Sequence, residues 1–96
     1  MRTNYIVSYD VCDPKRLRRV HRACKDYGVH LQYSVFECDL TERERLELEH
    51  RLVELIDRSE DQILFIELGP SHTRGERRII ALGQEYAKVE VPCFVL

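Results

Sequence analysis

The chain of 96 residues lacks any long hydrophobic run. None of its apolar stretches approaches the ~18 consecutive residues that a membrane-spanning helix needs, so we expect no contact with a membrane. The first ten residues also lack the layout of a secretory signal. Internal repeats, low-complexity tracts and linkers are missing too. We therefore expect a single cytoplasmic domain that spans residues 1–96.

Common catalytic and metal-binding motifs are also missing. The sequence contains no HExxH helix, no GxGxxG or Walker phosphate loop and no nucleophile elbow. Its four cysteines form no CxxC pair and have no histidine at zinc-site spacing. This pattern favours buried, reduced thiols over a disulfide or a metal site. A catalytic site, if the chain has one, must be built from other residues.

Charge is present in both signs but is unevenly distributed. The formal net charge is only −2. Residues 1–30 hold seven basic and three acidic residues, whereas residues 31–67 hold four basic and eleven acidic ones. This separation predicts one basic surface suited to a polyanion and one acidic surface suited to a basic partner.

Local patterns predict a strand and a basic helix near the start of the chain. Tyr5–Tyr9 is rich in β-branched and aromatic residues, which is typical of a strand. A helix should follow, with Asp13 as its N-cap, Pro14 in its first turn and an end near Gly28. A basic stripe lies opposite the apolar face of this helix, and we favour anion binding over a merely solvated face. The stripe consists of Lys15, Arg18, Arg19, Arg22 and Lys25.

The middle of the chain predicts extended structure and then a second helix. Residues 29–40 are extended in character and form either one long strand or two strands broken near residues 32–34. Thr41 and Glu44 have the spacing of a capping box. The second helix should therefore start there and run to about Arg58.

Further apolar stretches complete the predicted fold. Residues 61–69 predict a central strand, residues 77–83 a short additional strand and residues 89–96 an edge strand. This order predicts an α+β, ferredoxin-like βαββαβ sandwich with an extra C-terminal strand and both helices on one sheet face. A second copy is the simplest cover for the other face, so we expect a two-fold homodimer. Residues 84–96 should form a C-terminal extension that packs on the dimer partner.

Asp10 is the strongest candidate for a functional residue. It ends the first predicted strand, where its carboxylate can project beside the start of the basic helix. One carboxylate is a weak site for Mg²⁺ or Mn²⁺, because these ions prefer several oxygen ligands. Two copies of Asp10 near a dimer axis would supply a shared metal site that activates water. The alternative is an ordinary exposed or turn-forming aspartate, which is our interpretation of Asp13.

Other polar and aromatic residues are weaker candidates. His21 and His30 flank the end of the first predicted helix, and a structural role is commoner there than that of a general base. Ser34 and Glu37 are candidates for positioning roles. Three aromatic residues are interpreted as sheet packing rather than as platforms for base stacking, namely Tyr9, Tyr33 and Phe36.

Two stretches of the sequence resemble a known family. YIVSYDV (Tyr5 to Val11), followed by a helix, and QYSVFEC (Gln32 to Cys38), before a threonine-capped helix, are similar to the small CRISPR-associated endonucleases of the Cas2 family. The order of elements agrees along the whole chain. The two stretches together carry the resemblance, because neither alone is specific.

The resemblance implies a ferredoxin-like homodimer with Mg²⁺- or Mn²⁺-dependent endonuclease activity on single-stranded RNA or on DNA. It also implies a role in CRISPR spacer acquisition, in which the dimer binds DNA and bridges copies of an integrase subunit. Asp10 matches the metal-binding and catalytic aspartate, and Phe36 matches the aromatic residue of the second stretch. Tyr9, Ser34 and Phe36 are predicted as supporting residues. Arg16, Arg18 and Arg19 fall where members place helix arginines, and Lys15 and Arg22 complete the predicted nucleic-acid-binding set.

Three alternatives remain open. In the first, the chain is a non-catalytic DNA-binding scaffold of the adaptation complex. In the second, it is a toxin-like ribonuclease related to virulence-associated protein D, whose fold and first-strand acid are similar. A ligand-binding regulatory domain on the same fold is the third alternative, because fold does not determine function. No sequence motif indicates the small-molecule pocket that this third class requires.

Overall fold

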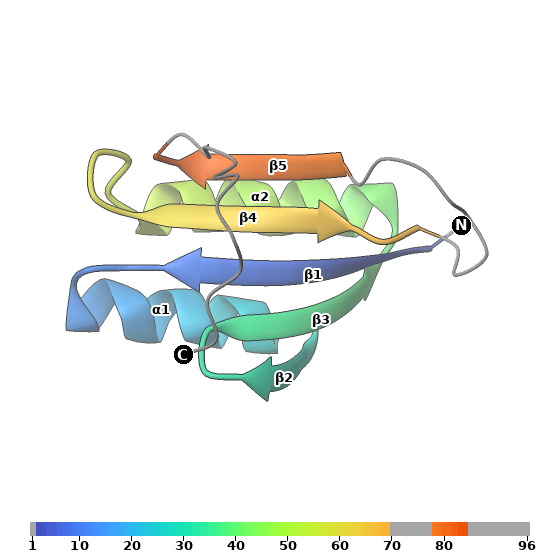
Figure 1. Ribbon diagram of the computed structural model, residues 1–96, viewed down its shortest axis with the longest axis horizontal. Helices are drawn as coiled ribbons and strands as arrows, with labels where there is room; N and C mark the ends of the chain where they lie inside the picture. The colour runs from blue at the N-terminus through green and yellow to red at the C-terminus, as the bar shows by residue number, and fades with distance from the viewer. Residues whose placement is uncertain (1, 70–77, 85–96) are drawn as a thin grey trace, which may run out of the picture.

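The computed structural model describes residues 2–69 and 78–84, which form a five-stranded sheet and two helices (Figure 1). The predicted edge strand at 89–96 and, apart from Gln84, the predicted extension at 84–96 lie outside the described residues. Within the described ranges, neither helix is long and apolar enough to cross a membrane. In chain order the elements are β1 (Thr3–Asp10), α1 (Pro14–Lys25), β2 (Val29–Gln32), β3 (Val35–Leu40), α2 (Glu42–Leu55), β4 (Gln62–Glu67) and β5 (Arg78–Gly83).

The sheet is antiparallel throughout, with the strand order β2-β3-β1-β4-β5. The N-terminal strand β1 lies in the centre, paired with β3 on one side and β4 on the other. Both helices lie against the same face of the sheet (Figure 1). This arrangement confirms the predicted ferredoxin-like sandwich, with β5 as the extra strand at the outer edge of β4.

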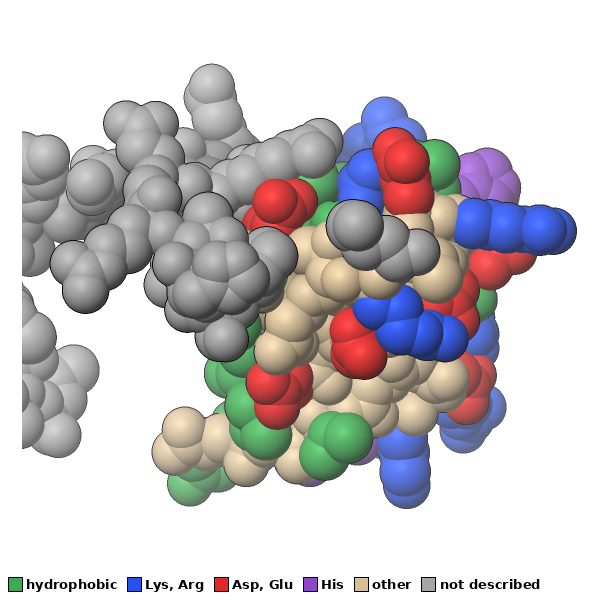
Figure 2. Space-filling view, turned by 90° about the vertical axis from the view of Figure 1, so that its right-hand side faces the viewer, with side chains coloured by type: hydrophobic (Ala, Val, Ile, Leu, Met, Phe, Trp, Pro, Cys, Tyr) green, Lys and Arg blue, Asp and Glu red, His purple; other side chains and the backbone are tan. Residues whose placement is uncertain are grey.

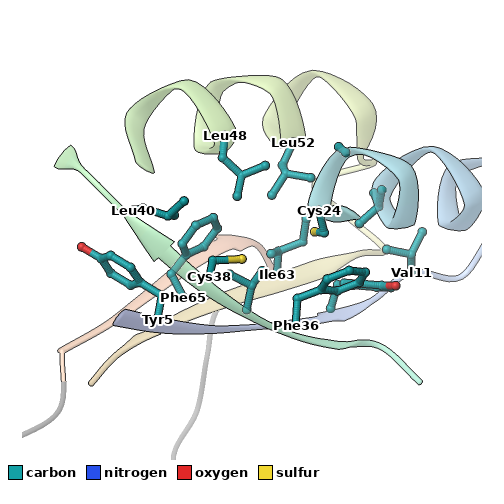
Figure 3. Packing of buried hydrophobic residues seen from close by; sticks show 14 residues of the cluster. Tyr5, Val11, Cys24, Phe36, Cys38, Leu40, Leu48, Leu52, Ile63 and Phe65 are labelled. Carbon is teal, nitrogen blue, oxygen red and sulfur yellow. The ribbon is translucent and has the colours of Figure 1, made fainter. Parts of the chain in front are cut away.

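Alternate strand residues face the helices and build the core. On β1 these residues are Tyr5, Val7 and Tyr9, each at most 4% exposed. They pack between the sheet and the helices with side chains from every layer (Figure 3), including Cys24, Phe36, Cys38, Leu40, Leu48, Leu52, Ile63 and Phe65. The strict alternation along β1 follows from the two-residue period of a strand.

The opposite face of the sheet has an apolar centre that neither helix covers. Ile6 lies opposite Ile66 in the register of β1 and β4, and Ser8 lies opposite Leu64. Ile6, Leu64 and Ile66 are only partly buried. No described element covers this face, and it is the surface for which a second copy is expected.

The predicted helix starts are confirmed. The side chain of Asp13 accepts a hydrogen bond from the backbone amide of Arg16 at 2.9 Å, and Pro14 occupies the first turn of α1. Thr41 and Glu44 form both hydrogen bonds of the capping box, at 3.1 and 2.9 Å. These local contacts satisfy amides that have no partner inside the helix.

The predicted end of the second helix at Arg58 is wrong, because α2 ends at Leu55. The next residue, Ile56, is extended. The carboxylate of Asp57 accepts hydrogen bonds from the backbone and hydroxyl of Ser59, at 2.9 and 2.6 Å. The backbone amide of Asp57 donates to Asp61 instead of to a helical carbonyl. Side-chain hydrogen bonds to nearby backbone groups thus replace the last helical turn.

Residues 29–40 form two strands, which resolves the open alternative for this segment. β2 ends at Gln32 and β3 begins at Val35, with Tyr33 and Ser34 in the turn between them. Tyr33 has a φ of 35°, which a residue with a side chain rarely adopts. The turn therefore changes the direction of the chain where the sequence pattern alone is compatible with continuous extension.

Candidate functional site

Asp10 lies at the end of β1 on the face turned away from the helices. Tyr9 is buried against the helices, and Asp10, one residue later, is exposed on the other side of the strand. β4 places Gln62 opposite it. The carboxylate of Asp10 forms no hydrogen bond or ion pair with another described residue. It is therefore available to a ligand from outside the chain.

A single copy of the chain supplies only part of a site for a hard cation. Within residues 2–69 and 78–84, no three His, Cys, Asp or Glu side chains gather closely enough to hold a metal ion. Mg²⁺ and Mn²⁺ take oxygen ligands, and the Asp10 carboxylate has the right chemistry but is one ligand. The donor set fits such a cation only if further oxygens come from another molecule, such as a second copy.

Asp61 is an acidic residue near Asp10 that the sequence analysis missed. Its side chain is completely buried. One carboxylate oxygen accepts from Arg16 Nε at 2.8 Å and from the Asp57 amide at 2.9 Å, and the other accepts from the Cys12 amide at 3.0 Å. Burial alone would raise the pKa of Asp61, but the bonds from Arg16, Asp57 and Cys12 hold it below its usual value. Asp61 thus stays ionised and ties three segments together.

The Asp61 network fixes the loop that leaves Asp10. It joins the β1–α1 loop to the α2–β4 loop, and the start of α1 to both. The backbone carbonyl of Asp61 also accepts from the Gln84 amide at 2.8 Å. A side chain at the neighbouring Gly83 would place its Cβ 2.2 Å from this carbonyl oxygen, so the close approach requires glycine. Asp61 therefore positions the site without forming part of its exposed surface.

Arg16 is separated from the other predicted nucleic-acid contacts. Its guanidinium pairs with Asp61 at 2.8 Å and with Glu60 at 3.1 Å, and its side chain is only 23% exposed. The hydrogen bond to Asp61 raises the pKa of Arg16. Because its donors are used inside the chain, we assign Arg16 to the network around Asp61 and do not include it among the residues that contact nucleic acid.

The basic stripe on α1 is exposed and has no acidic partner among the described residues. Lys15, Arg18, Arg19, Arg22 and Lys25 form no ion pair with a described residue. The acid that follows them, Asp26, pairs instead with Arg51 of α2 at 2.9 Å. The end of the molecule where β1 begins is different, because acidic and basic side chains are interspersed there (Figure 2) and Arg2 pairs with Glu44 at 3.0 Å. The outer face of α1 therefore carries positive charge that no described acidic side chain neutralises.

The predicted supporting residues gather on the other side of β1 from Asp10. Tyr9 and Phe36 are buried in the core, which confirms their interpretation as sheet packing. The hydroxyl of Tyr9 lies 2.8 Å from Nδ1 of His21. Burial raises the pKa of Tyr9 to about 12, with a smaller contribution from Cys24. Ser34 accepts a backbone hydrogen bond from Tyr9 at 3.0 Å, but none of these side chains joins Asp10.

Tyr33 does not pack on the sheet as predicted, because its side chain is 88% exposed in the turn between β2 and β3. It lies at a cavity of about 620 Å³ whose other walls are α1 and β1. The residues lining this cavity are Tyr9, Leu17, Arg18, His21, Arg22, Lys25, Tyr33 and Ser34. No motif in the sequence indicated this cavity, because it forms between segments that only the fold brings together.

The cysteines are free thiols, but not all of them are buried. Cys24 and Cys38 are buried, and burial raises their pKa values to about 12 and about 11. The prediction of burial is wrong for Cys12, which is exposed in the loop after β1. Cys93 lies outside the described residues.

Comparison with known proteins places the chain in a family. The family described as CRISPR associated protein Cas2 matches residues 3–74. The chain belongs to the Cas2 family. It is 36% identical over 92 residues to CRISPR-associated endoribonuclease Cas2 1 of Rhodospirillum rubrum, covering 96% of this chain and 89% of that protein. It is 45% identical over 69 residues to CRISPR-associated endoribonuclease Cas2 of Nitratidesulfovibrio vulgaris, covering 67% and 68% of the two chains.

Solved structures of the Cas2 family have the same fold. Streptococcus pyogenes Cas2, solved at pH 6.5, is similar with a TM-score of 0.61 and 45% identity, covering 65% of this chain and 81% of that one. A second structure, described as Cas2, has a TM-score of 0.69 and 29% identity, covering 97% and 100% of the two chains. The predicted resemblance to the Cas2 family is thus confirmed, as is the fold that it implied.

His21 and His30, whose rings lie next to each other, predict a dependence of stability on pH. Burial, then His30 and Lys25, lower the pKa of His21 below its usual value of 6.5. The folded state therefore binds a proton at His21 less readily than the unfolded state does. Stability should be complete above pH 6.5 and fall as the pH decreases through the lowered value. The free energy of unfolding, measured in urea between pH 7.5 and 5, should decrease more steeply with falling pH in the wild type than in His21→Gln. His50→Gln, on the exposed face of α2, is the matched control, and equal slopes in all three proteins would contradict the prediction.

Proposed function

We propose that this chain is the subunit of a homodimeric endonuclease that hydrolyses phosphodiester bonds of RNA or DNA with Mg²⁺ or Mn²⁺. One observation carries the proposal. Asp10, an exposed carboxylate at the end of the central strand, has no partner among the described residues, and it lies one loop away from a basic helix whose exposed cations also have none there. The relatives named endoribonucleases support the same activity.

The proposed dimer brings together what one chain lacks. The sheet face turned away from the helices carries Ile6, Leu64 and Ile66, and burying this apolar surface against its own copy would stabilise a two-fold pair. Asp10 lies at the edge of the same face. Two copies of Asp10 near the axis would then hold one cation between them, and that cation supplies activation of water and neutralisation of a phosphate when bound.

The residues of α1 would hold the substrate backbone. Arg18, Arg19 and Arg22 are exposed and have no acidic partner among the described residues, so phosphate oxygens can take their hydrogen bonds. Such contacts fix the position of the strand without reading its sequence. The Asp61 network keeps the loop after Asp10 in place while the backbone lies across α1.

Cleavage assays test the enzymatic proposal. A defined single-stranded RNA and a defined DNA duplex are incubated with Mg²⁺, with Mn²⁺ and with EDTA. We expect cleavage that EDTA abolishes and that Asp10→Asn reduces at least about 100-fold, because the amide cannot replace the anionic ligand. Glu47→Gln, an exposed acid on α2, should cleave like the wild type. Cleavage by Asp10→Asn at the wild-type rate would exclude Asp10 as the catalytic residue.

Salt dependence tests the role of the basic stripe. Binding to a DNA duplex should weaken steeply with salt, because each phosphate contact releases bound cations. Replacing Arg18 and Arg22 by Gln should reduce the slope of log K against log[salt] by roughly one unit per lost contact per chain. Arg43→Gln, an exposed arginine of α2, should leave the slope unchanged. A slope that is the same in all three proteins would show that the stripe is only a solvated face.

A non-catalytic role in the same complex is the second candidate function. The specific observation in its favour is that the described residues of one chain gather no three metal ligands. In this case the dimer would bind DNA through α1 and bridge an integrase subunit during spacer acquisition. Binding without cleavage by the wild type, with the salt dependence described above, would favour the scaffold over the nuclease.

A further inference from the structure

The cavity beside α1 is a second feature that could bind a ligand, and it is separate from Asp10. Its volume of about 620 Å³ is in the range of small-molecule sites. It opens on the helix side of the sheet, between α1 and the β2–β3 turn, whereas Asp10 lies on the opposite face of β1. The proposed function uses Arg18 and Arg22 at the rim of this cavity but assigns no role to its aromatic and apolar lining.

One side of the cavity is cationic. Arg18, Arg22 and Lys25 are spaced at i, i+4 and i+7 and therefore follow one side of α1. Within the described ranges none of the three has an acidic partner. Asp26, the acidic residue that follows Lys25, pairs with Arg51 instead. Three adjacent cations without counter-charge favour an anion with several oxygens, such as a phosphate group.

The β2–β3 turn contributes an aromatic residue to the lining of the cavity. Tyr33 is 88% exposed, although aromatic residues are usually at least partly buried. Its turn is held in place from both sides, since a ring nitrogen of His30 lies 2.6 Å from the Tyr33 carbonyl oxygen and the Tyr9 amide donates to the Ser34 carbonyl at 3.0 Å. The backbone at Tyr33 is thus held in place while its ring remains exposed, so the ring is open to a stacking partner.

The floor between the two sides is largely apolar. Leu17 is 39% exposed there, and the buried ring of Tyr9 lies below it beside His21. A ligand that satisfies all three parts needs a negative group, a flat ring and some apolar surface. A nucleotide has these properties, with its phosphate toward α1 and its base against Tyr33.

We propose that this cavity is a subsite for one unpaired nucleotide of a single strand or of a frayed strand end. The proposal rests on the proposed function, since it assumes that the chain binds nucleic acid. The base stacks on Tyr33, and Arg18, Arg22 and Lys25 hold the adjoining phosphate. A paired base cannot enter, because its faces are covered by its neighbours in the duplex. The subsite therefore gives the protein a preference for unpaired over paired strands, without a preference for sequence.

Fluorescence anisotropy on one labelled strand, alone and annealed to its complement, tests the subsite. We expect Tyr33→Ala to weaken binding of the single strand about 5- to 100-fold and to change duplex binding less than about 2-fold. Tyr33→Phe, which keeps the ring, should bind both as the wild type does. A strand with abasic sites along its length should bind the wild type and Tyr33→Ala equally. Thermal unfolding of Tyr33→Ala should match the wild type, because the side chain is exposed.

The outcomes distinguish the subsite from the general function. If Tyr33→Ala leaves single-strand binding unchanged while Arg18→Gln with Arg22→Gln weakens it, nucleic-acid binding stands and the stacking subsite is overturned. Equal weakening for single strand and duplex also overturns it, because Tyr33 would then act on the backbone or on the fold. If the wild type binds neither nucleic acid, both the proposed function and the subsite are wrong.

Discussion

Asp61→Ala is expected to lower the free energy of unfolding by about 3 kcal/mol, the lower end of the range for breaking a buried ion pair. The carboxylate is completely buried and accepts hydrogen bonds from Arg16 and from the amides of Cys12 and Asp57. Its removal leaves these donors without a partner, and buried unsatisfied donors are costly. The loss should not reach the upper end of the range, because Arg16 can still contact water.

Urea unfolding at one fixed protein concentration measures this loss, so that any dimerisation affects all variants equally. Glu60→Gln is the matched control, because Glu60 pairs with the same arginine at 3.1 Å but is 56% exposed. This control should cost less than about 1 kcal/mol. Similar small losses in both variants would show that the buried network contributes little to stability.

Mixed dimers of wild type and Asp10→Asn should retain about a quarter of the wild-type activity when the two chains are combined in equal amounts. Random pairing in a two-fold dimer leaves only that fraction with both aspartates, and the shared site proposed above needs both. One independent site per chain would leave about half. Subunits are exchanged by refolding, and mass spectrometry of the intact dimers confirms that the pairing is random.

An equal mixture of wild type and Glu47→Gln controls for losses during refolding and should keep the full activity of the wild type. A half-active Asp10 mixture, with exchange confirmed, would refute the shared site while leaving Asp10 catalytic. Cleavage independent of Asp10 in every mixture would instead indicate that the activity belongs to another residue or to a contaminant.

The parts of the fold that depend on local patterns could be predicted from the sequence. The alternating apolar residues of β1, the cap at Asp13 and the capping box at Thr41 act within a few residues, and each is confirmed. The order of elements then leaves few ways to arrange the sheet, because sequential connections and helix cover limit the topology. Asp10 could be located at the end of the first strand from the local pattern alone.

The contacts that could not be predicted depend on residues far apart in the chain. Asp61 reaches the amide of Cys12 only because β1 pairs with β4 in the register that places Asp10 opposite Gln62. The same pairing brings Arg16 to Asp61 and so takes it out of the predicted nucleic-acid-binding set. Tyr33 looks like a strand residue in the sequence, and only the turn between β2 and β3 exposes it.

The central place of β1 also affects how the protein can be made. The ribosome releases this strand before its two neighbours in the sheet, β3 and β4, which end only at Leu40 and Glu67. At about 5–20 residues per second, several seconds pass between the emergence of β1 and the completion of its second edge. During this interval Tyr5, Val7 and Tyr9 have no complete core to enter, and both strand edges are open to other chains. A nascent chain that stops before β4 therefore has no folded state to reach, and it becomes a substrate for chaperones or proteases.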